Sequence, residues 1–404
     1  MAAARKGWWR AGAFAVGIGM ALAPLSTAGA SDSSGTALAP LLGTTGADVV
    51  AGRYIVVLDD DATDARVQTA SAAATAAGGT VRVSYTHALR GFSADLPASA
   101  LAAVRAADGV KYVEADARVQ AAKVQPNPPS WGLDRVDQRD LPLNSKYAYI
   151  RKAGKGVDVF IIDTGIRFTH NDFGGRATSG FDAVDGGSAD DCNGHGTHVA
   201  GTAAGKAYGV AKKSALIAVR VLDCGGGGTW EGVIAGVDWV TGNHSGPSVA
   251  NMSIQGGKTQ AVNDAITNSI NSGVVYAVAA ANFSDDACGY SPASTPLAIT
   301  VGATSINDAR AGFSNYGTCL DLFAPGENIT SAWWTSDSAV NTISGTSMAS
   351  PHVAGVAALY LSKNPGATTT QVRDEIVDNA TNGKVTDPGP GSPNELLYSK
   401  VNTF

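Results

Sequence analysis

Beyond residue 131, short apolar runs alternate with longer segments that have a helical pattern. The runs are rich in β-branched residues and bounded by polar or glycine residues, so they predict strands. These predicted strands cover 157–162, 215–222, 249–254, 274–280 and 297–301, and the predicted helices include 195–204, 230–240, 262–272, 347–361 and 370–380. Continuous apolar strands between helices indicate an α/β fold, with a buried parallel sheet covered on both faces. A ligand cleft is expected at the carboxyl ends of such strands.

Residues 52–120 have a different rhythm, and we interpret them as a separate small domain. The pattern predicts a strand at 53–58, a helix at 62–77, two strands within 80–96, a helix at 99–107 and a strand at 110–114. That βαββαβ order is typical of a ferredoxin-like α+β sandwich. A proline-rich joint at 125–129 forms a natural boundary, so we expect a linker at 31–51, this domain at 52–120 and the large domain at 121–404.

The first thirty residues predict a secretory signal peptide. Arg5, Lys6 and Arg10 precede an apolar stretch at 11–25, and Ala28-Gly29-Ala30 is a cleavage pattern of small residues. The alternative is a membrane anchor, but the stretch is shorter than the roughly 20 residues that a spanning helix needs. We therefore expect a secreted, extracellular protein with no membrane contact after signal removal.

Composition narrows the chemistry further. The net charge of −6 is modest and no run of Lys or Arg is present, so a nucleic-acid partner is not expected. The four cysteines of an exported chain favour disulfides, for which three connectivities are possible. They are Cys192, Cys224, Cys288 and Cys319. Since neither CxxC nor HExxH spacing occurs, a zinc site is disfavoured.

Three motifs carry the candidate chemistry. Asp163 ends the first predicted strand of the large domain, His195 opens a helix within Asn193-Gly194-His195-Gly196-Thr197-His198, and Ser347 lies at the start of another helix. Any one of these residues alone has a structural explanation, such as a cap or a polar rim. Together, in the chain order Asp, His, Ser, they predict a nucleophilic serine, its general base and the carboxylate that orients the base.

These motifs resemble those of the subtilase family of serine peptidases. Asp163-Thr164-Gly165, His195-Gly196-Thr197-His198 and residues 345–349 (Gly-Thr-Ser-Met-Ala) carry the resemblance, which extends over nearly the whole chain after the signal peptide. Within the family, the chain is similar to the proteinase K group and most of all to aqualysin-type enzymes. The resemblance implies a subtilisin-like, doubly wound fold and disulfides that join Cys192 to Cys224 and Cys288 to Cys319.

The resemblance also implies the residues that bind substrate. Asn282 corresponds to the asparagine that stabilises the oxyanion, although Ala281 stands beside it where relatives usually have glycine. Gln255 likewise replaces a glycine in one of the two edges that hold the extended substrate chain. The substrate-binding residues expected are Gly226, Gly227, Gly228, Ser253, Ile254, Gln255, Ala280 and Ala281. Small residues in the presumed pocket predict cleavage after large apolar or aromatic residues.

Two further expectations follow from the resemblance. A structural calcium ion is expected on the carbonyl oxygens of Pro296 and Ala298 and the carboxylate of Asp321. Residues 52–120 are expected to be an inhibitory propeptide that the enzyme itself removes between about Val119 and Gln125. The mature protein is expected to act as a monomer on protein and peptide substrates.

Two rival functions remain open at this stage. A catalytically silent binding protein on the same scaffold would lack at least one of Asp163, His195, Ser347 and Asn282, and all are present. An esterase of α/β-hydrolase type would have its serine in a Gly-x-Ser-x-Gly elbow. Here Ala349 stands at the second glycine position. The sequence therefore favours a secreted serine endopeptidase.

Overall fold

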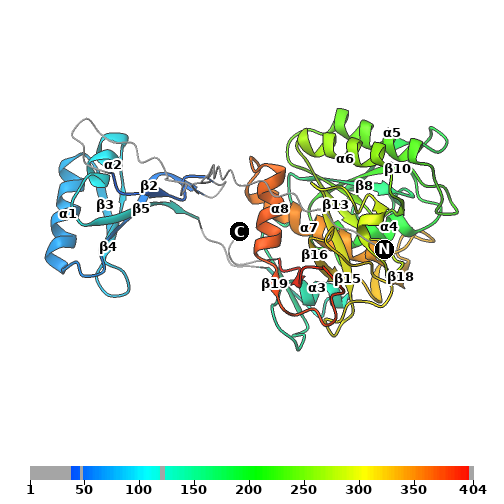
Figure 1. Cartoon of the computed structure of the whole chain (residues 1–404). Coiled ribbons are helices and arrows are strands. Elements are labelled where there is room, and N and C mark those ends of the chain that lie inside the picture. The colour runs from blue at the N-terminus through cyan, green and yellow to red at the C-terminus, as the bar shows by residue number, and fades with distance from the viewer. Residues whose placement is uncertain (1–37, 46–48, 119–122, 400–404) are drawn as a thin grey trace, which may run out of the picture. The chain divides into compact units, whose positions relative to one another are not determined.

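The chain folds into two compact units, shown in a computed structural model that describes residues 38–45, 49–118 and 123–399 (Figure 1). The N-terminal unit is built on Ala51–Asp116 and the C-terminal unit on Ala117–Phe404. The predicted signal peptide at 1–30 lies outside the described residues. None of the helices in the described part of the chain has the length and apolarity required to span a membrane.

The N-terminal unit is a five-stranded sheet with the strand order β1-β5-β2-β4-β3. Its elements are β1 Leu41–Leu42, β2 Val49–Leu58, α1 Asp64–Ala76, β3 Thr80–Tyr85, β4 Gly91–Asp95, α2 Ala98–Arg105 and β5 Val110–Ala117. The predicted βαββαβ order is present, with α1 and α2 packed together. The two-residue strand β1 lies in the stretch expected to be linker, where Leu41 and Leu42 pair with Val113 and Glu114 of β5.

The C-terminal unit is built on a nine-stranded sheet with the order β19-β20-β16-β15-β13-β11-β8-β10-β9. Every pair in it is parallel except β19 with β20. The strands are β8 Asp158–Asp163, β9 Ala177–Asp182, β10 Ala215–Arg220, β11 Ser248–Met252, β13 Val274–Ala279, β15 Ile299–Thr304, β16 Leu322–Pro325, β19 Thr381–Asn382 and β20 Glu395–Leu396. The doubly wound α/β architecture expected from the sequence is therefore present.

Helices cover both faces of this sheet. Along β8, Val159 and Ile161 belong to one core and Phe160 and Ile162 to the other, which explains the uninterrupted apolar run. Helices α4, α7 and α8 pack into the first core, and α5 and α6 into the second. Their bounds are α4 His195–Ala204, α5 Trp230–Asn243, α6 Gln260–Asn271, α7 Thr346–Lys363 and α8 Thr369–Asp378.

Shorter elements surround the sheet, and the sequence pattern missed most of them. They are α3 Trp131–Val136, the pairs β6 Lys123–Pro126 with β7 Lys146–Tyr149, β12 Gly256–Gly257 with β14 Tyr290–Ser291 and β17 Ile329–Ala332 with β18 Val340–Ile343, and the 3-10 turn η1 Ala287–Gly289. The strand predicted at 297–301 instead begins at Ile299, because Leu297 is exposed.

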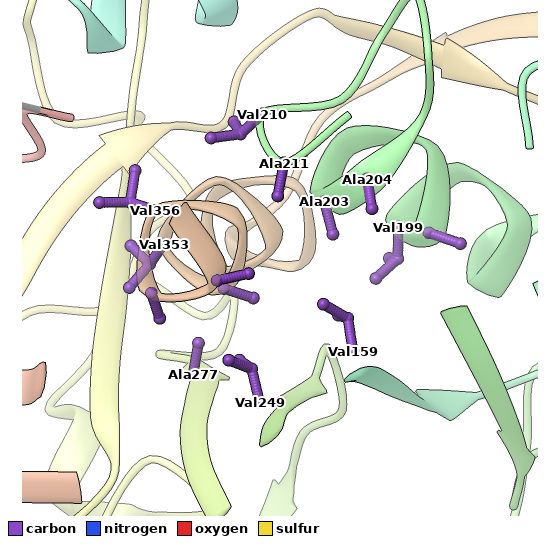
Figure 2. Packing of buried hydrophobic residues seen from close by; sticks show 14 of the residues in the cluster. Val159, Val199, Ala203, Ala204, Val210, Ala211, Val249, Ala277, Val353 and Val356 are labelled. Carbon is purple, nitrogen blue, oxygen red and sulfur yellow. The ribbon is translucent and has the colours of Figure 1, made fainter. Parts of the chain in front are cut away.

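The first core is closed by direct packing of α4 against α7 (Figure 2). Both helices contribute valines and alanines to this core, with Val249 and Ala277 of the sheet below α7 and Val159 nearer to α4. A Cβ atom on Gly355 would lie 2.8 Å from the carbonyl oxygen of Ala203 and 2.5 Å from Cβ of Val210. Glycine at this position therefore sets how closely α7 approaches α4.

Both disulfides lie in the C-terminal unit. Cys192 is joined to Cys224 with a Cα–Cα distance of 4.9 Å, and Cys288 to Cys319 at 5.3 Å. This is the pairing that the resemblance implied, and it uses all four cysteines of the chain.

Candidate active site

Asp163 is the last residue of β8 and is fully buried. The chain turns immediately after it, and the backbone N–H of Thr164 donates to Asp163 Oδ1 at 2.8 Å. This places a carboxylate at the carboxyl edge of the sheet, where the strands of a doubly wound fold leave room for a ligand.

His195 is the first residue of α4 and contacts Asp163 directly. Its Nδ1 lies 2.8 Å from Asp163 Oδ1. Because a carboxylate only accepts, Nδ1 carries the proton and the opposite nitrogen, Nε2, is left free to act as a base. The start of α4 can approach the turn after β8 only because residue 196 is glycine. A Cβ atom on Gly196 would lie 2.2 Å from the carbonyl oxygen of Gly165.

The surroundings of His195 act on its pKa in opposite directions. Burial lowers the pKa, whereas the charge and hydrogen bond of Asp163 and the charge of Asp191 raise it. The pKa of His195 is raised overall above its ordinary value of 6.5. The protonated form of His195 is therefore stabilised in place.

Asp191 holds the start of α4 against the turn that follows β8. Its Oδ1 accepts from the Thr164 hydroxyl and from the backbone N–H groups of Asn193 and Gly194, each at 2.9 Å. Its Oδ2 accepts from the backbone and the hydroxyl of Thr197. A carboxylate at a helix N-terminus also complements the helix dipole. Sequence analysis missed this residue, although an acid four residues before a helix-opening histidine is a detectable signal.

Ser347 is the second residue of α7, and its hydroxyl donates to the carbonyl oxygen of Ser253 at 3.3 Å. The backbone N–H groups of the first helical turn have no acceptor within the helix, so that of Ser347 is available to an anion. Ser347 and His195 thus both lie at the N-termini of helices that pack against each other.

Asn282 lies next to Ser347, with an amide group whose orientation is well defined. Its Oδ1 accepts from the backbone N–H of Thr346 at 2.8 Å and from the Thr346 hydroxyl at 3.0 Å. Nδ2 is consequently turned the other way, where it donates to Oε1 of Gln255 at 2.9 Å. The sequence did not indicate that Thr346 orients Asn282, nor that Asn282 contacts Gln255.

A cleft with a volume of about 730 Å³ joins these groups. Ser347, His195 and Asn282 line it together with most of the substrate-binding residues predicted from the sequence. The predicted residues in its lining are Gly226, Gly227, Gly228, Ser253, Ile254 and Gln255. Ala280 and Ala281 are not part of the lining and are fully buried. Ala281 has a φ of 79°, a left-handed conformation that glycine adopts more readily than alanine.

The glycine run forms a turn, not a strand. Asp223 Oδ1 accepts from the backbone N–H groups of Gly225 and Gly227, and the N–H of Asp223 donates to the carbonyl oxygen of Gly227. The exposed backbone of this turn forms one wall of the cleft.

Two other histidines near the site are structural. His198 is fully buried, donates through Nε2 to the Ile329 carbonyl, and has its pKa lowered to about 3 by burial. His352 is also fully buried, contacts the carbonyl oxygen of Met348 through Nδ1, and has its pKa lowered by burial to about 4. Both stay neutral near pH 7, and neither lines the cleft.

The residues expected to hold calcium are only partly suited to it. Asp321 Oδ2 accepts from the backbone N–H of Thr300 at 2.7 Å, and Oδ1 forms an ion pair with Arg373. Both carboxylate oxygens therefore have donors already, and a cation would have to share or displace Arg373. Among the described residues, no group of three or more His, Cys, Asp or Glu side chains could hold a metal.

Comparisons with known proteins match both units. The "Subtilase family" model matches residues 154–395, and "Peptidase inhibitor I9" matches residues 53–122. The chain is 50% identical to an extracellular serine proteinase of Thermus sp. (strain Rt41A), over 91% of this chain and 94% of that protein. It is 51% identical to alkaline serine exoprotease A of Vibrio alginolyticus, over 78% of this chain and 59% of that protein. The crystal structure of a cold adapted subtilisin-like serine proteinase matches with a TM-score of 0.65 and 54% identity, covering 67% of this chain and 97% of that one.

Proposed function

The chain belongs to the subtilase family, as a secreted subtilisin-like serine proteinase with an I9 propeptide domain, and from that premise we propose that it cleaves internal peptide bonds through an acyl-enzyme. The observation that carries this proposal is the hydrogen bond of 2.8 Å between His195 Nδ1 and Asp163 Oδ1, in the same cleft as Ser347.

In the proposed reaction, Ser347 Oγ attacks the scissile carbonyl while its proton passes to Nε2 of His195. Asp163 keeps the imidazole in the required tautomer and stabilises the imidazolium. His195 then gives that proton to the leaving amine, and a water molecule repeats the sequence to release the acyl group.

The developing oxyanion would be bound by the backbone N–H of Ser347 and by Nδ2 of Asn282. Support for the second donor comes from Thr346, whose two hydrogen bonds to Oδ1 turn Nδ2 toward the cleft. A donor that is already oriented needs no reorganisation when charge develops.

We propose a preference for large apolar or aromatic residues before the scissile bond. Apolar side chains of Leu222, Trp230, Val233 and Ile254 line the cleft, and its described lining contains no Asp, Glu, Lys or Arg. A charged substrate side chain would therefore find no partner of opposite charge there.

We further propose that the N-terminal unit is a propeptide removed by the enzyme itself. The segment β6 supports a cut before Lys123, since residues 123–126 already pair with 146–149 of the C-terminal unit. Gln125 Nε2 also donates to the Ala207 carbonyl oxygen of that unit. A strand held by backbone pairing is a poor substrate for a protease, which disfavours a cut within 123–126.

Structural calcium at Pro296, Ala298 and Asp321 remains a proposal as well. It is supported by the family, whose members generally bind structural calcium, and by the burial of Asp321, whose side chain is 10% exposed. The ion would share or replace the charge compensation that Arg373 provides and would cross-link the loop at 296–298 to Asp321.

A digest of a peptide library by the purified mature protein tests the proposed activity. We expect cleavage at internal bonds, mainly after apolar or aromatic residues, and labelling of Ser347 by a fluorophosphonate. Ser347→Ala should abolish both. A protein that hydrolyses simple esters but no peptides would favour the esterase alternative, and one that binds peptides without cleaving them would favour the silent binding protein.

A further inference from the structure

The amide of Asn282 has a hydrogen-bond acceptor in front of it before any substrate arrives. Because the backbone N–H of Thr346 can only donate, the atom of Asn282 facing it must be the oxygen. Nδ2 therefore faces Gln255, and the Gln255 atom 2.9 Å from it must be Oε1. A side-chain carbonyl thus occupies the donor that the proposed reaction assigns to the oxyanion.

Gln255 is well placed to leave that position. Its backbone is anchored on both sides, by the buried residues Ser253 and Ile254 before it and by the pairing of β12 with β14 after it. The side chain itself is exposed and lines the cleft with Ser347 and His195. A rotation about side-chain bonds alone would clear the donor, without any change in the backbone.

We propose that Gln255 is a gate on the oxyanion site, a positioning residue that acts through Asn282. In the free enzyme its Oε1 accepts from Asn282 Nδ2, and the carbonyl oxygen of a peptide substrate must replace it before Ser347 can attack. This inference rests on the proposed function and adds to it a step of substrate entry. The gate competes with any ligand that presents a carbonyl or oxyanion at this position, whatever its side chains.

The size of the effect follows from the strength of one exposed amide hydrogen bond. Breaking such a bond in water changes an equilibrium by about twofold to tenfold. Gln255→Ala should therefore raise kcat/KM for a peptide p-nitroanilide by about twofold to tenfold. It should lower the inhibition constant of a peptide aldehyde, whose tetrahedral adduct places an oxygen on Asn282, by the same factor.

A double-mutant comparison separates gating from a wider cleft. In an Asn282→Ala background no donor is left to release, so adding Gln255→Ala should not change kcat/KM. An analogue of the peptide aldehyde in which a methylene replaces the aldehyde carbonyl cannot accept from Asn282. It should therefore bind wild type and Gln255→Ala equally. Gln260→Ala, at an exposed glutamine that bonds to Asp264 outside the cleft, serves as the matched control and should leave every constant unchanged.

Three results would overturn the gate. They are an unchanged or lower kcat/KM for Gln255→Ala in an active enzyme, an equal gain in the Asn282→Ala background, and an equal gain in binding of the methylene peptide. A wild-type protein without peptidase activity would overturn the proposed function and the gate together, so the two failures are distinguishable.

Discussion

The two units of the molecule use charge in different ways. In the N-terminal unit, ion pairs such as Arg66–Asp108 and Arg90–Asp64 lie at the surface, and among its described residues no side chain in an ion pair is less than 29% exposed. The C-terminal unit has surface pairs too, but it also buries Arg135 with Asp308, whose side chains are 0% and 9% exposed.

This difference suits the proposed removal of the N-terminal unit and the retention of the C-terminal unit. Exposed pairs contribute little to stability, and a small domain buries a smaller fraction of its surface than a large one. The N-terminal unit is therefore easier to unfold and digest once it is detached. The C-terminal unit, with its disulfides and buried pairs, is better protected against its own activity.

Loss of the proposed nucleophile should have the largest effect on this contrast between the units. Ser347→Ala should leave a secreted precursor that still carries residues 31–120, because the same serine is proposed to release the N-terminal unit. Turnover should fall about a millionfold, a magnitude carried over from subtilisin. N-terminal sequencing of both proteins from a host free of other proteases provides the measurement. Maturation of the alanine variant at the wild-type position would refute self-processing.

Loss of the buried ion pair should lower the free energy of unfolding far more than loss of an exposed one. Arg135→Met leaves Asp308 buried without its partner, and loss of one member of such a pair costs about 3 to 5 kcal/mol. Urea unfolding in the inactive Ser347→Ala background avoids self-digestion and gives the change directly. Arg66→Ala, whose partner Asp108 is fully exposed, should produce no resolvable change. Equal effects of the two variants would contradict the contrast between the units.

Reduction of the disulfides should affect only the C-terminal unit, since all cysteines lie between residues 192 and 319. Each bridge closes a loop over a sequence separation of 31 or 32, which the chain-entropy model values at about 3 to 4 kcal/mol. A thiol reductant added to the Ser347→Ala precursor should lower the melting temperature of the C-terminal unit alone. The Cys288→Ser/Cys319→Ser variant should show part of that loss without reductant.

Calcium removal should have a smaller effect, also confined to the C-terminal unit. A chelator should lower its melting temperature, because an ion at a hundredfold excess over its dissociation constant contributes about 2.7 kcal/mol. Asp321→Ala should abolish the response to chelator. Arg373→Ala, which removes the competing ion pair but keeps the carboxylate, should retain or enlarge it. An unchanged melting curve with and without chelator in wild type would argue against the site.

Acid should change the stability contributions of two carboxyl groups, one in each unit, in opposite directions. Hydrogen bonds from Arg53 and Arg82 lower the pKa of Asp95, so its stabilising contribution is present above pH 3.8 and is lost as the pH falls through the lowered pKa. Burial raises the pKa of Asp137 in the C-terminal unit to about 7, so the folded state favours the protonated carboxyl. The stability that this preference contributes is present below pH 3.8 and is lost as the pH rises through 7. Melting of the Ser347→Ala precursor between pH 3 and 8 tests this, with Asp95→Asn and Asp137→Asn as variants that should remove each dependence.

Local sequence patterns predicted much of the fold and the motifs of the site. The helix predicted at 195–204 has the observed bounds of α4, because Gly194 and Gly205 flank a run that favours helix. The strand β16 was missed because Leu322–Pro325 is only four residues long and ends in proline. Short strands with few apolar residues leave too little periodicity to detect.

Contacts between distant side chains were out of reach of the sequence. Gln255 and Asn282 are 27 residues apart, and Arg373 and Asp321 are 52 apart. Each meeting depends on strand order and on the exact paths of loops, which no local pattern encodes. The substitutions at Gln255 and Ala281 were visible as departures from the family, but what Gln255 contacts became evident only in three dimensions.

The contact at Gly355 has a consequence for anyone who wants to alter this enzyme. His195 and Ser347 start two helices whose separation is set where Gly355 meets Ala203, well along both helices and out of reach of any substrate. A displacement of about 1 Å between reacting groups can slow an enzyme about a hundredfold. Libraries for tuning rate or working temperature should therefore include Gly355 and its neighbours, where adding a single methyl group would push apart the helices that carry the proposed nucleophile and base.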